Sequence, residues 1–87
     1  MAEPSFTPSF LKRVAELEKN ASAIEQRLLE QTLARILIDP YLPERFPTFY
    51  DPALPTSFVR SGPFLIEFSV DEKTDVVTFV SLFHRRS

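Results

Sequence analysis

The chain has 87 residues, 44% of them hydrophobic, and its formal net charge is −2 at pH 7. This length predicts one domain spanning residues 1–87, and the slight acidity argues against a protein that holds nucleic acid by charge alone. The sequence has no cysteine and one histidine, which excludes disulfides, thiolate metal sites and zinc sites with several imidazoles. No metal or other cofactor is expected.

The hydropathy of the chain carries no membrane or secretion signal. No stretch approaches the roughly 18 apolar residues that a membrane span needs. Residues 1–10 contain neither the basic region nor the apolar region of a secretory signal peptide. We therefore expect a cytoplasmic protein without a membrane partner.

Two helices are predicted in the first 38 residues, after a short extended segment. Thr7 is followed by a proline, which is typical of an N-cap and a first helical position, and apolar residues then recur at helical spacing over 8–19. Ser22 and Glu25 match a capping box, in which each side chain bonds a free backbone N–H of the other's residue. The second helix should end at about Ile38, before an Asp-Pro pair, and the two helices should form an antiparallel hairpin.

Residues 39–57 form a proline-rich segment with five of the eight prolines. The segment also holds the aromatic residues Tyr41, Phe46, Phe49 and Tyr50. Disordered linkers are poor in aromatics, so we expect an ordered loop that is pinned to the body of the domain by these rings. About twenty residues is long for a loop in so small a domain, which suggests a role for it.

From residue 56 onward the hydrophobic pattern changes to the period of two that is typical of strands. Strands are predicted at 58–60, 64–70 and 76–83, the last being apolar on both faces and therefore central. The predicted fold class is α+β: a short N-terminal strand, a helical hairpin, a long Pro-rich loop and a C-terminal three-stranded antiparallel meander. The hairpin should cover one face of the sheet, leaving the other open or covered by a partner.

This order of elements resembles that of the RelE/ParE toxins, and local motifs accompany it. Residues 6–10 are similar to the opening strand and first helix of these toxins, and 37–40 to the Asn/Asp-Pro end of their second helix. Residues 59–72 resemble their Arg-x-Gly hairpin, and 79–86 resemble a final strand that ends in His-Arg-Arg. The chain is identified as a divergent member of this superfamily.

The resemblance implies the toxin component of a type II toxin–antitoxin system, held inactive by a cognate antitoxin protein. RelE-like toxins cut mRNA on the ribosome without a metal, so the chain could be a metal-independent endoribonuclease. ParE-like toxins poison DNA gyrase, and inhibition of gyrase is the first alternative. The second alternative is a non-toxic binding or scaffold domain that is derived from the same fold.

The ribonuclease hypothesis assigns roles to four residues by resemblance. Arg85 matches the catalytic arginine of the family, and His84 beside it could be the general acid or base, because imidazole titrates near neutral pH. Arg86 and Arg60 would bind the substrate phosphate. The family's second arginine, in a Tyr-Arg pair, is replaced here by Leu65.

Each candidate also has a purely structural interpretation. His84 and the arginines after it could be a solvated tail, and Arg60 an ordinary surface residue. For Glu67, we favour an ion pair with a neighbouring arginine over a role as a base. For Tyr41 and Tyr50, we favour places in the core over base stacking.

Overall fold

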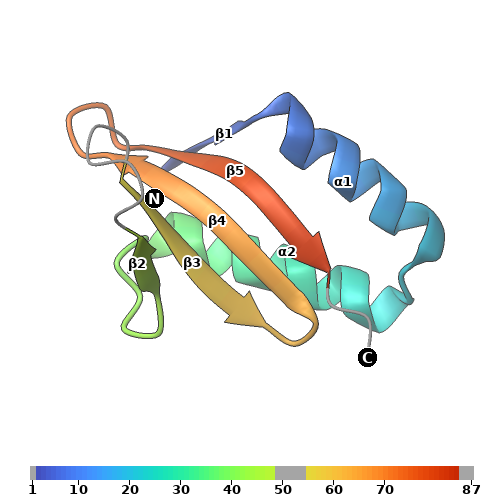
Figure 1. Ribbon diagram of the computed structural model, residues 1–87. Coiled ribbons are helices and arrows are strands. Elements are labelled where there is room, and N and C mark those ends of the chain that lie inside the picture. The colour runs from blue at the N-terminus through green and yellow to red at the C-terminus, as the bar shows by residue number, and fades with distance from the viewer. Residues whose placement is uncertain (1, 49–54, 85–87) are drawn as a thin grey trace.

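The computed structural model of the chain describes residues 2–48 and 55–84. It contains two helices and one five-stranded sheet (Figure 1). In chain order the elements are β1 (Glu3–Phe6), α1 (Pro8–Asn20), α2 (Ala23–Ile38), β2 (Phe46–Thr48), β3 (Thr56–Ser61), β4 (Phe64–Asp71) and β5 (Val76–His84). The predicted α+β class is confirmed.

Both helices begin at the caps that the sequence predicts. The hydroxyl oxygen of Thr7 accepts a hydrogen bond from the backbone N–H of Phe10 at 3.1 Å. Ser22 and Glu25 form the full capping box, with the side chain of each accepting from the backbone N–H of the other. These bonds satisfy N–H groups that the first turn of a helix leaves without partners.

The sheet is larger than the predicted three-stranded meander. Its strand order is β1-β5-β4-β3-β2, in which only β1 is parallel to its neighbour. The meander β3–β4–β5 is present, and β1 and β2 extend it at opposite edges. β1 pairs with β5 only over Val76–Phe79, so the second half of β5 borders α1 instead. There the Thr7 hydroxyl donates to the Val80 carbonyl at 2.7 Å, and Nε of Arg13 donates to the Leu82 carbonyl at 3.4 Å.

The Pro-rich segment differs from the predicted loop in two ways. It contains a strand, β2, which pairs antiparallel with β3. The rings of Tyr41 and Phe46 are 46% and 61% exposed, so the prediction that they pack into the body is wrong for both. Phe49 and Tyr50 lie outside the described residues.

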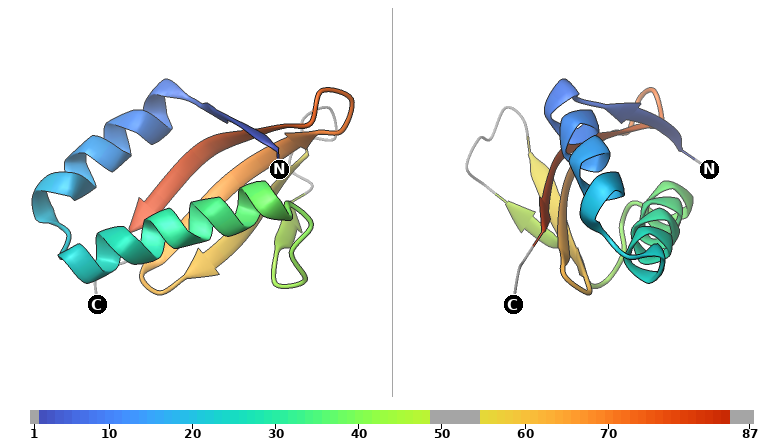
Figure 2. Two further views of the ribbon diagram at one scale, coloured as in Figure 1. Left: turned by 180° about the vertical axis from the view of Figure 1, so that it is seen from behind. Right: turned by 90° about the vertical axis from the view of Figure 1, so that its right-hand side faces the viewer.

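Both helices lie on one side of the sheet and diverge from their shared turn (Figure 2). The core lies between the two layers. Strand residues that face the helices are almost completely buried, and they are Val59, Phe64, Ile66, Phe68, Val77, Phe79 and Leu82. Thr32 of α2 is also buried, and its hydroxyl bonds the Ser61 hydroxyl of β3 at 2.6 Å. Neither of the described helices has the length and apolar character that crossing a membrane would require.

A bulge in β5 changes which of its side chains face the helices. Phe68 is opposite Phe79 and Glu67 is opposite Ser81, so Val80 is an extra residue in β5. Side chains alternate between the two faces of a strand, and one extra residue reverses the alternation beyond it. Phe79 and Leu82 therefore both face the core, although they are three residues apart.

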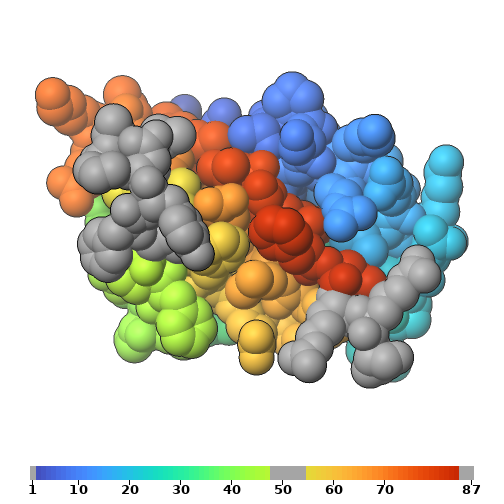
Figure 3. All heavy atoms as spheres, in the orientation of Figure 1, coloured from blue at the N-terminus to red at the C-terminus, as the bar shows by residue number. Residues whose placement is uncertain are grey.

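Neither of the two described helices lies on the opposite face of the sheet, which we call the open face. The side chains that it carries include Thr56, Phe58 and Arg60 of β3, Leu65, Glu67 and Ser69 of β4, and Thr78, Ser81 and Phe83 of β5. Side chains of these three strands reach the surface between the two grey segments of Figure 3.

Candidate functional site

A row of three side chains crosses the open face near the β3–β4 turn. Arg60 is directly opposite Leu65, and Leu65 is directly opposite Phe83. Side chains opposite one another on a sheet lie about 5 Å apart at Cβ, so the three are neighbours. The ring of Phe58 is 6.4 Å from that of Phe83 and extends the apolar part of the row. The row is an aromatic and aliphatic surface that ends in a guanidinium group.

His84 ends β5 and faces the helices, as the alternation beyond the bulge requires. Its ring packs against the ring of Phe64, with the centroids 5.2 Å apart. Its Nε2 lies 3.1 Å from Oε2 of Glu25, at the beginning of α2. The His84 side chain is 24% exposed. His84 is thus a fixed, partly buried residue and not a freely solvated tail.

The structure brings two predicted site residues to one place. Arg60 and His84 both line a hollow of about 180 Å³ at the β3–β4 turn, together with Leu65 and Phe83. Arg85 and Arg86, which follow His84 directly in the sequence, lie outside the described residues. The hollow combines a guanidinium group, an imidazole and an aromatic ring, which can bind an anion, exchange a proton and stack a base, respectively.

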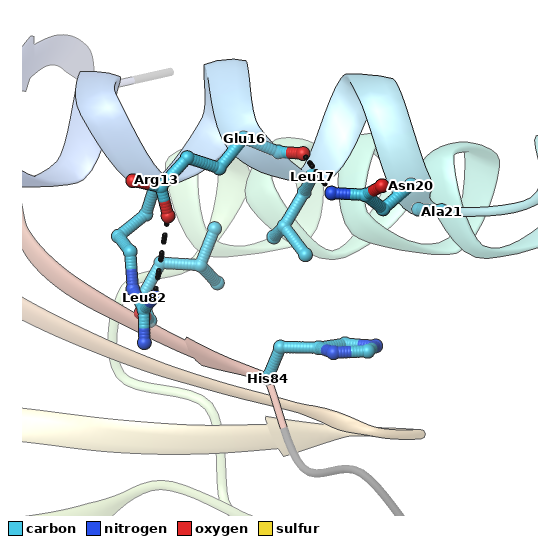
Figure 4. A pocket seen from close by; sticks show the side chains of 7 residues that line it. All are labelled: Arg13, Glu16, Leu17, Asn20, Ala21, Leu82 and His84. Carbon is cyan, nitrogen blue, oxygen red and sulfur yellow. Dashed lines mark hydrogen bonds and ion pairs between the residues drawn. The ribbon is translucent and has the colours of Figure 1, made fainter.

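His84 also lines a second hollow, of about 480 Å³, between α1 and the end of β5. Figure 4 shows His84 entering this hollow from the strand and Arg13 reaching down from the helix. Nη1 of Arg13 lies 3.3 Å from Oε2 of Glu16, and the amide of Asn20 donates to the Glu16 carbonyl at 3.1 Å. Sequence reasoning did not single out Arg13, because no local pattern connects it to a strand 69 residues away.

Glu25 supplies the negative charge of the site. The hydrogen bond from His84 lowers the pKa of its carboxyl group from the ordinary value of 4.5, and the backbone N–H of Ser22 lowers it further, while burial acts in the opposite direction. The ionised carboxylate therefore faces the imidazole. Within 2–48 and 55–84, no three histidine, cysteine or acidic side chains are grouped as metal ligands would be.

Two other candidates from the sequence lie in different surroundings. The carboxylate of Glu67 accepts a hydrogen bond from the Thr56 hydroxyl at 2.8 Å, and none of the arginines in 2–48 and 55–84 forms the predicted ion pair with it. Tyr41 donates its hydroxyl to Glu72 at 3.1 Å, beside the β4–β5 turn and thus at the far end of the strands from His84. Burial, followed by the bond to Glu72, raises the pKa of Tyr41.

No protein-family model matches the sequence, and no curated protein matches it. Solved structures do resemble it. The isolated RelE toxin of E. coli superposes with a TM-score of 0.71 at 16% identity, over 100% of this chain and 87% of that one. The archaeal RelE–RelB complex from Pyrococcus horikoshii gives 0.73 at 17% identity, over 97% and 94%.

A metal-bound toxin from Helicobacter pylori is also similar, with a TM-score of 0.67 at 15% identity over 97% of this chain and 94% of that one. The chain therefore has the fold of the RelE toxins, from β1 to the end of β5. This confirms the fold that the sequence motifs predicted.

Proposed function

We propose that this chain with the RelE toxin fold is the toxin of a type II toxin–antitoxin system, acting in the cytoplasm as a single domain over residues 1–87. Its proposed activity is metal-independent cleavage of mRNA at the ribosome. The observation that supports this most directly is the meeting of Arg60 and His84 in one hollow. The sequence separates them by 24 positions.

The groups around this hollow match the needs of RNA cleavage through the ribose 2′-hydroxyl. The imidazole of His84 can take the proton of the attacking hydroxyl, and the guanidinium of Arg60 can bind the phosphate. The exposed ring of Phe83 offers a surface on which a base can stack. Arg85 as a catalytic cation and Arg86 as a phosphate ligand complete the proposal, because both directly follow His84 in the chain.

An antitoxin is the proposed protein partner. Two of the structural relatives are described as RelBE and RelE–RelB complexes, so that fold is known to form such assemblies. Several large apolar side chains are exposed, and a partner could cover them. They are Phe6, Leu11, Ile24, Ile38, Phe46 and Phe83. An antitoxin that covers Phe83 would also block the proposed site.

Induction in a bacterial host tests this proposal. The wild-type chain should arrest growth, and mapping of RNA ends after induction should show new cuts within translated mRNA. His84→Gln and Arg60→Ala should lower the cleavage rate by about 100-fold or more, as loss of a general base or phosphate ligand does. Lys73→Ala, in the exposed turn at the other end of the sheet, is the matched control and should cut like the wild type.

Arg85→Ala provides the corresponding test for the proposed catalytic arginine. Co-expression of the protein encoded beside this gene should restore growth of the wild-type strain. Normal growth on induction of a soluble, folded wild-type chain contradicts the proposed toxicity.

A specific observation favours inhibition of gyrase as the second candidate. Leu65 occupies the middle of the Arg60–Leu65–Phe83 row, where the resemblance implies an arginine in ribonuclease members. Supercoiling by purified gyrase in the presence of the chain distinguishes the two activities. Inhibited supercoiling without mRNA cuts would identify the chain as a gyrase inhibitor instead of a ribonuclease. If the chain shows neither effect, the non-toxic binding domain is the remaining hypothesis.

A further inference from the structure

Glu25 joins two parts of the chain that are 59 residues apart. Its Oε1 accepts the backbone N–H and the hydroxyl of Ser22, at 3.3 and 3.2 Å, in the capping box of α2. Its Oε2 lies 3.1 Å from Nε2 of His84. One carboxylate thus holds the beginning of α2 with one oxygen and the end of β5 with the other. Because the capping box fixes the first oxygen, the direction of the second is also fixed.

Two contacts hold the imidazole of His84 in place and leave its Nδ1 available for reaction. The ring of Phe64 packs against it at 5.2 Å, and the bulge at Val80 turns it toward the helix layer. Within the described part of the chain, no hydrogen bond reaches Nδ1. A carboxylate on one imidazole nitrogen fixes which nitrogen carries the proton, orients the ring and stabilises the imidazolium form.

We propose that Glu25 is a positioning residue for His84, and that Nδ1 is the nitrogen that works as the base. This inference rests on the proposed ribonuclease function. Glu25 keeps the proton on Nε2, so Nδ1 has a free lone pair. Nδ1 takes the proton of the 2′-hydroxyl while that oxygen bonds to phosphorus. The P–O5′ bond breaks and the leaving oxygen takes a proton from water, and the hydroxide that remains takes back the proton from Nδ1. The products are a cyclic phosphate, a free 5′-hydroxyl and a neutral His84.

The other charged groups near His84 do not replace the carboxylate. Arg13 and Glu16 of α1 line the larger hollow with His84, but they neutralise one another at 3.3 Å. Arg60 of β3 lines the smaller hollow and adds a positive charge. Among the described residues, Glu25 is therefore the acidic group that bonds His84, and the pKa of the Glu25 carboxyl group is lowered first by that same hydrogen bond.

Glu25→Gln separates this role from a structural one. Glutamine also serves in a capping box, so the variant keeps the start of α2 while it removes the charge that faces the imidazole. His84 is the only histidine of the chain, so the ¹⁵N NMR signals of its ring report without ambiguity which nitrogen carries the proton. We expect the wild type to carry it on Nε2. In Glu25→Gln the carbonyl oxygen stays on the backbone N–H of Ser22 and the amide N–H₂ group faces Nε2, so the proton should move to Nδ1 and the rate of mRNA cleavage should fall by at least about tenfold.

Glu16→Gln is the matched control, because Glu16 lines the same hollow but bonds Arg13. It should change neither the position of the proton nor the cleavage. A proton that stays on Nε2 in Glu25→Gln overturns the pairing, whatever the activity. A moved proton with unchanged cleavage overturns the role in the reaction. A wild-type chain that cuts no RNA overturns the proposed function and this role with it, while the ¹⁵N signals still decide whether the pair exists.

Discussion

The two faces of β3, β4 and β5 differ in how far their side chains are buried. On the face toward the helices, Ile66, Phe68 and Phe79 are 0% exposed, and the pattern of buried side chains is continuous. On the open face, Phe58 and Leu65 are only partly buried, and Phe83 is 46% exposed. The open face also carries Glu67 in the middle of the sheet, where its carboxylate accepts a hydrogen bond from the Thr56 hydroxyl. Large apolar side chains occur on both faces, but the two described helices cover only one of them.

This difference separates stability from recognition. Burial of apolar area stabilises the helix face in the isolated chain, at about 25 cal/mol for each Å² removed from water. On the open face, the same kind of residue remains accessible and contributes little to folding. An apolar side chain there remains available for the partner and base contacts proposed above.

The largest effect is expected from removing a phenylalanine ring on the helix face. Phe68→Ala deletes a fully buried ring from the centre of β4 and leaves a cavity beneath the helices. The free energy of unfolding should fall by about 3–5 kcal/mol, as measured by urea denaturation. Phe83→Ala on the open face is the matched control and should cost about 1 kcal/mol or less, because nearly half of that ring is already in water. Equal losses would show that the open face is as tightly packed as the core.

The sequence predicts the parts of this division that depend on near neighbours. The Thr7 cap and the Ser22–Glu25 box involve residues three apart, and the strand at 64–70 shows simple alternation. Each of these patterns lies within one helix or strand, so it can be recognised without knowing the rest of the fold.

The sequence does not predict features that depend on register between distant segments. The bulge at Val80 is one such feature, since only pairing with β4 shows that one residue is extra. Without the bulge, simple alternation from Phe79 would turn His84 to the open face. The bond between His84 and Glu25, like the bond from Arg13 to β5, could not be foreseen for the same reason. The parallel pairing of β1 with β5 joins the two ends of the chain and was likewise hidden.

A second prediction concerns the β3–β4 turn, which lies close to α2. Gly62 has a φ of +57°, and a Cβ built on it would lie 2.6 Å from Cδ2 of Leu28 in α2. Gly62→Ala should therefore lower the free energy of unfolding by about 1–2 kcal/mol, through left-handed backbone strain and the clash with the helix layer. Thermal or urea denaturation measures the loss.

Leu28→Ala separates the two causes at this turn. In that background the clash is removed and only the backbone strain remains, so Gly62→Ala should cost less than it does in the wild type. An identical cost in both backgrounds would mean that the close approach of Leu28 has no part in it.

A third and smaller effect is expected at the beginning of α2. Ser22→Ala removes the hydroxyl that accepts from the backbone N–H of Glu25 at 3.2 Å. The loss of this cap should lower the free energy of unfolding by about 1 kcal/mol. Ser22→Asp can accept the same N–H, so it should retain most of the stability. Ser22→Asp as destabilised as Ser22→Ala would contradict a capping role.

The smallest predicted effect is a change in how stability depends on pH, and it tests whether the Glu25–His84 bond contributes to folding. The bond from His84, with that from Ser22, holds the pKa of Glu25 below its ordinary value of 4.5 in the folded chain. A carboxyl group with a lowered folded pKa contributes stability above its unfolded pKa, and this contribution disappears as the pH falls through the folded pKa.

Wild type and Glu25→Gln should therefore differ most near neutral pH and converge in acid, in urea denaturation series run from pH 7 downward. Glu30→Gln removes the same charge from α2 without touching Ser22 or His84, and it should keep the pH dependence of the wild type. If the difference in free energy of unfolding between wild type and Glu25→Gln stays constant down to acid pH, the ionised form of Glu25 does not contribute to folding. The bulge and the ring of Phe64 would then position the end of β5. Oε1 of Glu25 would still cap α2, but the contact of Oε2 with His84 would add no stability.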